Sequence, residues 1–135
     1  TPKTSSAASD VYKRQEIVWQ HARGVPEAPS PLLYEGRIYA IKNGGLATCL
    51  DATSGKLLFE GRLGSGGPCY ASPVAGDGKI YHASARGVVT VLRAGDELAV
   101  LSRTDFGERI MATPALASGR VYLRTESALY SFGAD

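Results

Sequence analysis

A threefold internal repeat constrains the fold of this chain more than any single motif. Each copy carries a Ser-Pro or Thr-Pro pair, followed within a few residues by a Gly-Arg/Lys-Ile/Val-Tyr string. The tyrosines of these strings, Tyr39, Tyr81 and Tyr122, are 42 and 41 residues apart. A repeat period of about 40 residues indicates one structural unit that is copied along the chain.

The pattern inside each copy is that of β-strands. Apolar residues occur in short runs of β-branched and aromatic types between glycines, and the 3.6-residue period of helices is absent. The first copy predicts strands at residues 31–34, 37–41, 46–50 and 56–60, joined by turns rich in Gly, Asn and Asp. The second copy repeats this plan and is predicted to end its fourth strand near Ser102, whereas the third has only three strands.

Four short antiparallel strands repeated at about 40 residues are typical of a β-propeller blade. A parallel β-helix is the alternative, but it has shorter coils and fewer hairpin turns. The sequence therefore predicts an all-β fold of antiparallel four-stranded blades. We expect a partial propeller of about three blades, at residues 30–64, 72–104 and 113–133.

Two strings resemble a known repeat. Residues 49–59 read CLDATSGKLLF and residues 71–84 read ASPVAGDGKIYHAS. Together they resemble the pyrroloquinoline-quinone-type propeller repeat, and most closely its BamB-like group, over residues 17–132. The chain departs from this pattern at Phe59, where the repeat usually has Trp, and at residues 93–97, which replace the Asp-Ala-x-x-Gly turn.

The resemblance implies a non-catalytic scaffold or binding module with protein partners and no cofactor, outside the cytoplasm of a bacterium. It also implies a longer parent protein, of which this chain would be the C-terminal part and whose remaining blades would be further partners. Two alternatives remain open, namely a fragment of a quinone-dependent dehydrogenase and the sensor domain of a membrane-bound kinase. The dehydrogenase would need a calcium-binding Glu/Asn/Asp group and a basic residue facing the quinone, and the sequence shows no such group.

The N-terminal segment is expected to be foreign to the protein. Residues 5–15 read SSAASDVYKRQ, which matches the translation of a transposase-based sequencing adapter. Residues 1–15 are therefore excluded from the fold prediction, the alternative being a polar disordered leader. Residues 16–20 are then predicted to be the outer strand of a preceding blade, with Trp19 at the place of Phe59, which makes twelve strands in all.

The charge composition argues against nucleic-acid and membrane binding. Fifteen Lys and Arg residues against thirteen Asp and Glu residues give a net charge of +2. Residues 1–15 contain three of these cations and one anion, so the remainder of the chain is neutral and has no basic stripe. No apolar run reaches the length of about 20 residues that spans a bilayer.

No catalytic, cofactor-binding or metal-binding residue is predicted. Cys49 and Cys69 share no Cys-x-x-Cys motif and are expected to be free, partly buried thiols. The histidines are His21 and His82. His82 follows a predicted strand and is expected either to face the central channel or, by the simpler interpretation, to be a hydrogen-bonded or exposed strand histidine.

The charged side chains are also given structural roles. Asp51 opens a turn, where its carboxylate is expected to accept backbone N–H groups. Asp105, Glu108 and Arg109 lie in the connection at residues 104–111, either as a solvated loop or as the rim of a site. The repeat residues are expected to form turns, strand starts and inter-blade packing. They are Pro31, Gly36, Tyr39, Asp51, Gly55, Phe59, Pro73, Gly78, Tyr81, Gly87, Pro114, Gly119 and Tyr122.

Overall fold

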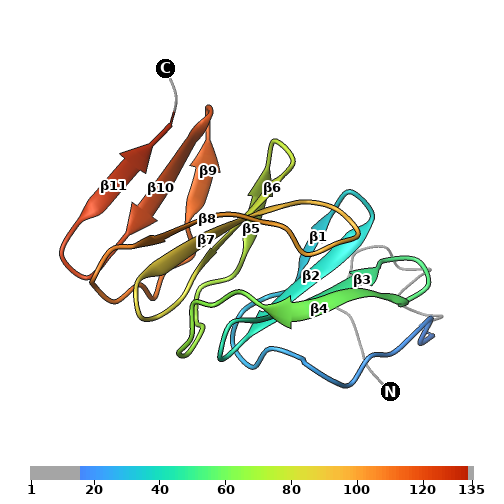
Figure 1. The fold of residues 1–135 in the computed structure, drawn as a ribbon. Helices are drawn as coiled ribbons and strands as arrows, with labels where there is room; N and C mark the ends of the chain where they lie inside the picture. Colours follow the sequence, from blue (N-terminus) through green and yellow to red (C-terminus); the bar gives the residue numbers. More distant parts are fainter. Residues whose placement is uncertain (1–15, 134–135) are drawn as a thin grey trace.

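The computed structural model describes residues 16–133, which form three antiparallel sheets and no helix (Figure 1). We call these sheets blades 1, 2 and 3. Blade 1 consists of β1 (Leu32–Tyr34), β2 (Arg37–Lys42), β3 (Leu46–Asp51) and β4 (Leu57–Arg62). Blade 2 consists of β5 (Val74–Gly76), β6 (Lys79–Ala83), β7 (Val88–Arg93) and β8 (Val100–Asp105). Blade 3 consists of β9 (Ala115–Ala117), β10 (Arg120–Arg124) and β11 (Leu129–Phe132).

Each blade is a meander in which every strand pairs with the next one along the chain. The first strands of the blades contact one another in order, β1 with β5 and β5 with β9, so they form the inner edge of a common arc (Figure 1). This arrangement of antiparallel meanders side by side, two of them four-stranded and one three-stranded, is that of a partial β-propeller. The prediction of an all-β, partial propeller is confirmed.

The predicted end of the outer strand of blade 2 was wrong. The sequence placed this end near Ser102, whereas β8 extends to Asp105. Along β8, Val100 pairs with Leu92 and Asp105 pairs with Val88, so the strand follows β7 over almost its whole length. Most of β8 is polar and exposed, and it therefore lacks the apolar alternation by which strands are detected in a sequence.

The predicted strand at residues 16–20 was also wrong, so the described residues contain eleven strands and not twelve. The indole N–H of Trp19 instead donates a hydrogen bond to the carbonyl oxygen of Ala52, at 2.9 Å. The indole ring lies against Gly55, where a Cβ atom would be only 2.6 Å from it. This segment therefore lies on the β3–β4 turn of blade 1.

Residues 1–15, for which we expect an adapter origin, are outside the described part of the chain.

The first hairpin of every blade turns through two residues in the left-handed region. A type I′ turn needs positive φ at both central positions, and its twist matches that of the strands. The pairs are Glu35 and Gly36 (φ 51° and 77°), Asp77 and Gly78 (53° and 72°), and Ser118 and Gly119 (52° and 74°). The repeated glycines thus stand at the second position of each turn.

Two apolar clusters hold the blades together, and the one between blades 1 and 2 is the larger. Its buried members are Tyr39, Ile41, Ala47, Cys49, Leu63, Cys69, Ile80 and Leu92. The cluster between blades 2 and 3 consists of Ala71, Ala83, Ile110 and Leu123. Both cysteines are free, as expected, but they are fully buried and not partly buried. Burial raises the pKa of the Cys49 thiol to about 11. That thiol is therefore protonated at neutral pH.

A series of hydrogen bonds also joins the blades at the repeat interval. The backbone N–H of Ser30 donates to the hydroxyl of Ser72, and the N–H of Ser72 donates to the hydroxyl of Thr113, both at 2.9 Å. These are the residues that precede the repeated prolines. The hydroxyls of Ser72 and Thr113 thus have an inter-blade role, which the sequence interpretation did not include.

Candidate functional site

The connections between the blades form one surface, which we call the connection surface. It comprises residues 63–73 and 106–114 together with the turns at 84–87 and 125–128. Backbone hydrogen bonds join these segments, with Ala85 N–H donating to Pro68 O and Ile110 N–H donating to Ala85 O. Loops held in this way by a rigid scaffold are common places for binding residues.

Glu108 is anchored within this surface. Its carboxylate accepts hydrogen bonds from the backbone N–H of Ser127 at 3.1 Å and from the Ser127 hydroxyl at 2.7 Å. The hydroxyl of Ser127 and then that of Thr125 lower the pKa of Glu108. Glu108 therefore connects the blade 2–3 linker to the β10–β11 turn. Arg109 is mostly exposed, with Nη2 3.7 Å from Oε2 of Glu126.

Exposed apolar side chains stand at the same repeat position on this surface. Tyr70 is 46% exposed and Met111 is 48% exposed, and each lies two residues before the hydroxyl residue of a Ser-Pro or Thr-Pro pair. A hollow of about 220 Å³ adjoins Met111. It is lined by Arg109, Met111, Ala112, Arg124, Thr125 and Glu126. Tyr, Met and Arg are enriched in protein–protein interfaces, so the surface is suited to a protein partner.

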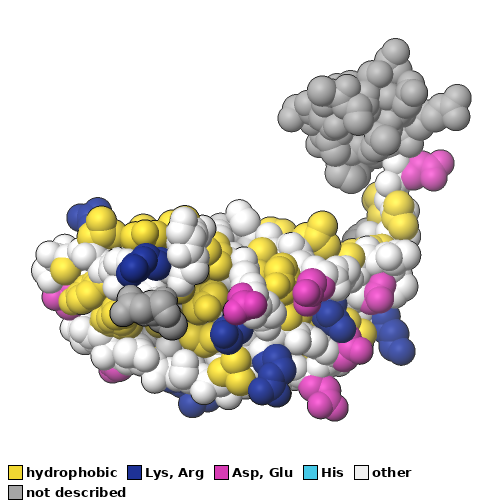
Figure 2. All heavy atoms as spheres, turned by 90° about the horizontal axis from the view of Figure 1, so that it is seen from above, with side chains coloured by type: hydrophobic (Ala, Val, Ile, Leu, Met, Phe, Trp, Pro, Cys, Tyr) yellow, Lys and Arg dark blue, Asp and Glu magenta, His cyan; other side chains and the backbone are white. Residues whose placement is uncertain are grey.

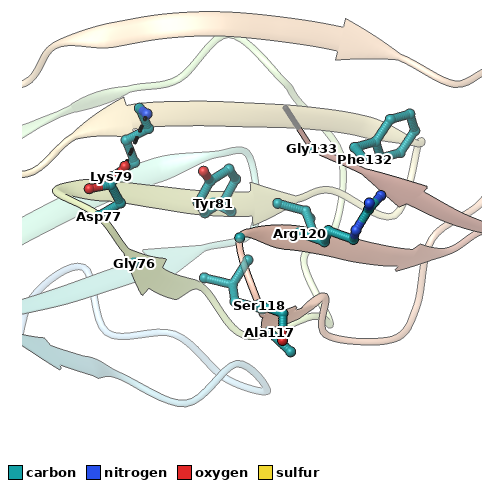
Figure 3. A pocket seen from close by; sticks show the side chains of 12 residues that line it. Gly76, Asp77, Lys79, Tyr81, Ala117, Ser118, Arg120, Phe132 and Gly133 are labelled. Atoms are coloured by element: carbon teal, nitrogen blue, oxygen red, sulfur yellow. Dashed lines mark ion pairs between the residues drawn. The ribbon is translucent and has the colours of Figure 1, made fainter. Parts of the chain in front are cut away.

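A second hollow, of about 570 Å³, lies between blades 2 and 3 at the opposite end (Figure 3). Tyr81 and Lys79 come from β6, and Arg120 and Phe132 come from blade 3. The Lys79 ammonium is 4.0 Å from the carboxylate of Asp77, a pair that Figure 3 marks with a dashed line.

The corresponding space between blades 1 and 2 is filled. There the Tyr34 hydroxyl accepts a hydrogen bond from the N–H of Gly78 at 2.8 Å, and the Tyr39 hydroxyl accepts one from the N–H of Gly95 at 3.1 Å. Arg37 forms an ion pair with Asp96 at 2.7 Å. Gly95 and Asp96 belong to the β7–β8 turn of blade 2. Within residues 16–133, blade 3 has no outer strand and therefore no equivalent turn to contact blade 2. The larger hollow is thus an incomplete inter-blade contact.

The repeated tyrosines are not equivalent in the structure. Tyr39 is buried and lies 6.3 Å from the ring of Phe59, measured between centroids, and burial raises its pKa. Tyr81 and Tyr122 are only half-buried. The repeated prolines each lie one residue before an inner strand, Pro31 before β1, Pro73 before β5 and Pro114 before β9.

Asp51 has the role that the sequence predicts. One carboxylate oxygen accepts the backbone N–H groups of Thr53 and Ser54, each at 2.9 Å. The hydrogen bond from Ser54 and then the one from Thr53 lower the pKa of Asp51. The carboxylate is used to hold the turn on which Trp19 lies.

Replacement of Asp51 by alanine is expected to lower the thermal midpoint of unfolding by a few °C, because two N–H groups of the turn lose their acceptor. Asp51→Asn keeps a carbonyl oxygen at this place and should lower it less. Circular dichroism at pH 7 gives both midpoints. Equal midpoints for the alanine variant and the unmodified chain would contradict this role.

His82 differs from both expectations. It is 0% exposed, so it faces neither an open channel nor solvent, and neither ring nitrogen has a hydrogen-bond partner among residues 16–133. It shares a face of β6 with Ile80, which packs in the cluster between blades 1 and 2. Burial lowers the pKa of His82 to about 4. The imidazole is therefore neutral at physiological pH.

Other kinds of site are not formed by the described residues. Within residues 16–133, no group of three or more His, Cys, Asp or Glu side chains is placed to hold a metal ion. No helix in this part of the chain is long and apolar enough to cross a membrane. On the face shown in Figure 2, Lys and Arg side chains alternate with Asp and Glu side chains and do not gather in one patch.

The sequence pattern of the family described as outer membrane protein assembly factor BamB matches residues 7–99, which is more than half of the chain. The chain belongs to the BamB family. Its membership confirms the resemblance to a propeller repeat of the pyrroloquinoline-quinone type. A search of curated proteins found no match.

Solved structures share the fold of this BamB-family chain. BamB from Moraxella catarrhalis is 21% identical, with a TM-score of 0.63 over 76% of the chain and 32% of that structure. The quinohemoprotein alcohol dehydrogenase ADHIIG from Pseudomonas putida HK5 is 16% identical, with a TM-score of 0.67 over 80% of the chain and 19% of that structure. A europium-containing methanol dehydrogenase is 14% identical, with a TM-score of 0.70 over 90% of the chain and 24% of that structure. The chain thus spans a third or less of the length of these proteins.

Proposed function

We propose that this BamB-family chain is part of a non-catalytic propeller that binds protein partners, outside the bacterial cytoplasm, during the assembly of outer membrane proteins. The match to the family of an outer membrane protein assembly factor is the observation that carries this proposal. A complete protein with further blades is part of the proposal, because the similar solved structures are at least three times as long as the aligned part.

The polar side chains of the repeat make hydrogen bonds within the fold, and this supports a scaffold. Asp51 and Glu108 accept hydrogen bonds from turns, and the Tyr39 hydroxyl accepts one from the next blade. These groups are thereby occupied within the fold. The exposed apolar side chains of Tyr70 and Met111 are left to contact a partner, and nearby arginines supply a polar rim.

The connection surface can be tested with single substitutions. We expect Tyr70→Asp and Met111→Asp each to weaken binding of the chain to purified outer membrane assembly machinery lacking its BamB component by about tenfold or more, because a charge enters an apolar contact. Leu57→Asp is the matched control, since Leu57 is an exposed apolar residue on the outer strand of blade 1. Biolayer interferometry measures the three affinities.

Two results would contradict the proposal. Failure of the unmodified chain to bind the assembly machinery would count against the assembly function itself. Binding with equal loss of affinity in the Leu57→Asp control would show that the connection surface is not the contact.

The alternative is a fragment of a quinone-dependent dehydrogenase, because two such enzymes share the fold. Titration with pyrroloquinoline quinone and Ca²⁺, followed by quenching of the Trp19 fluorescence, distinguishes the two functions. The scaffold proposal predicts no saturable quenching. Saturable quenching at micromolar quinone would favour the dehydrogenase.

A further inference from the structure

The linker between blades 1 and 2 begins with a loop, residues 64–67, whose backbone donors are unpaired. In Figure 1 this loop follows β4 and leads toward β5. The N–H groups of its four residues make no hydrogen bond with an acceptor among residues 16–133. The angle φ is positive at Gly64, Gly66 and Gly67 but not at Ser65. Such a change of hand brings successive N–H groups toward one side, which suits an anion.

The side chain of Ser65 is a further donor in this loop. Ser65 is only 6% exposed, and its hydroxyl has no hydrogen-bond partner among residues 16–133. The Ser65 hydroxyl oxygen and the Gly66 nitrogen lie 2.6 Å and 3.5 Å from the position that a Cβ atom of Gly45 would have. A buried hydroxyl without a partner is unfavourable, so this pair of donors calls for an acceptor that the described residues do not supply.

Arg86, from the β6–β7 turn, lies across the same loop. Its Nη1 and Nε atoms are 3.3 Å and 2.8 Å from the Cβ positions of Gly66 and Gly67. Arg86 is exposed, and no Asp or Glu among residues 16–133 forms an ion pair with it. The loop and this turn therefore leave several donors and one positive charge without a partner.

The linker between blades 2 and 3 has Glu108 at the place of Ser65. Ser65 lies against Gly45 and Glu108 lies against Gly87, with the nearest atoms 2.6 Å and 2.0 Å from the Cβ positions of these glycines. In each linker the residue two positions earlier donates its N–H to the oxygen of that glycine, at 2.8 Å and 2.9 Å. The two linkers can therefore be compared residue by residue at this point.

In the second linker, the Glu108 carboxylate is bound to the turn of the following blade. The backbone N–H and the hydroxyl of Ser127 donate to it, at 3.1 Å and 2.7 Å. Arg86 is in the corresponding turn of blade 2. The first linker thus has a hydroxyl at the place of the carboxylate and a guanidinium in the turn, so both partners are donors.

We propose that the loop at residues 64–67 and Arg86 together bind a carboxylate group that the chain itself does not supply. A guanidinium can hold a carboxylate through two parallel N–H donors, and such charge-assisted hydrogen bonds are stronger than neutral ones. The carboxylate belongs either to a free organic acid or to an Asp or Glu side chain of another protein. The proposal does not depend on the assembly function, since it follows from the unpaired donors.

The site can open because its cover is not held in place. No ion pair holds the guanidinium of Arg86, and exposed side chains change rotamer within nanoseconds. Gly66 and Gly67 are half-buried and have no side chains that would block their N–H groups. When Arg86 turns from the loop to the ligand, the hydroxyl of Ser65 comes within reach of the same carboxylate.

Titration of the nitrogen-labelled chain, followed by amide NMR spectra, is the first test. The probes are sodium acetate and the blocked peptide acetyl-Gly-Glu-Gly-amide, with sodium chloride keeping the ionic strength constant. We expect the amide signals of Gly66, Gly67 and Arg86 to shift and to saturate, with a dissociation constant of millimolar order. The peptide acetyl-Gly-Gln-Gly-amide is the ligand control, and it should cause no saturable shift.

The two carboxylate probes distinguish the sources of the ligand. Equal affinities would support the site with a free organic acid as ligand. Clearly tighter binding of the glutamate peptide would support it with an acidic side chain as ligand. Absence of shifts with both probes, or equal shifts with the glutamine peptide or with sodium chloride alone, would overturn the proposal.

Two arginine variants test the place of the site. We expect Arg86→Gln to weaken binding of the glutamate peptide by about tenfold, because a charge-assisted hydrogen bond is lost. Arg93→Gln is the matched control, since Arg93 is an exposed arginine at the end of β7 that adjoins the β7–β8 turn. It should change the affinity by less than about twofold, because its charge is far from the loop. Unchanged affinity in Arg86→Gln, or equal losses in the two variants, would overturn the proposal.

Ser65→Ala separates binding from folding. The Ser65 hydroxyl has no partner within residues 16–133, so its removal should leave the thermal midpoint of unfolding unchanged. We expect the same variant to weaken peptide binding severalfold. A lowered midpoint with unchanged affinity would assign the hydroxyl to the fold and would refute its part in the site.

Discussion

Gly87→Ala is expected to destabilise the chain more than any other single methyl addition in blade 2. Gly87 has a φ of +97°, and a Cβ atom there would lie 2.0 Å from the backbone oxygen of Glu108. Neither segment can move freely, because Phe106 donates its N–H to the oxygen of Gly87 and the Glu108 carboxylate is bound to Ser127. An alanine forced into the positive-φ region costs about 1–2 kcal/mol, and overpacking costs about 1–3 kcal/mol. We therefore expect the free energy of unfolding to fall by about 4 kcal/mol.

Gly78→Ala is the matched control for this prediction. Gly78 has a φ of +72°, but within residues 16–133 no atom outside its own chain neighbours lies within 4 Å of the position of an added Cβ. Its replacement should therefore cost only the conformational part, about 1 kcal/mol. Urea unfolding of the two variants and the unmodified chain measures the difference. Similar losses for both variants would mean that the contact between Gly87 and the linker is not close.

The second large effect is a loss of stability in mild acid caused by His82. Burial lowers the pKa of this histidine to about 4, from an ordinary value of 6.5. The unfolded chain therefore binds a proton below about pH 6.5 that the folded chain takes up only near pH 4. The contribution of the neutral imidazole is fully present above pH 6.5 and is lost as the pH falls to 4. Between pH 6.5 and pH 4 the free energy of unfolding is expected to fall by about 3 kcal/mol through this histidine.

His82→Leu isolates this effect, because blade 3 carries Leu123 at the equivalent buried position. The variant should show a much flatter dependence of unfolding free energy on pH between 6.5 and 4. Asp51 and Glu108 have lowered pKa values, so the stability that they contribute is lost at more acidic pH and in both proteins alike. Urea unfolding at several pH values makes the comparison. Parallel pH profiles for the two proteins would show that His82 is not buried as described.

Much of the fold could be predicted because it is encoded locally. The turns at Gly36, Gly78 and Gly119 follow from the need for positive φ, and the strands of blade 1 follow from short apolar runs between such turns. Asp51 was assigned correctly for the same reason, since its carboxylate accepts hydrogen bonds from residues two and three positions away. The repeat interval of about 40 residues then predicted that these local units form blades.

Contacts between a residue and the neighbouring blade became visible only in the tertiary structure. Glu108 is anchored by Ser127, 19 residues away, and no local pattern predicts that contact. The tyrosines occupy equivalent positions in the sequence, yet only Tyr39 is buried, because only it faces a complete blade with an outer strand. His82 is buried, and its ring nitrogens have no partner in the described part of the chain, because its face of β6 is the one that packs toward blade 1 through Ile80. The turns, the repeat period and most of the strands thus follow from the sequence alone, because short-range geometry controls them; the exceptions are residues 16–20 and the polar end of β8. Burial and long-range hydrogen bonds were decided only by the packing of one blade on the next.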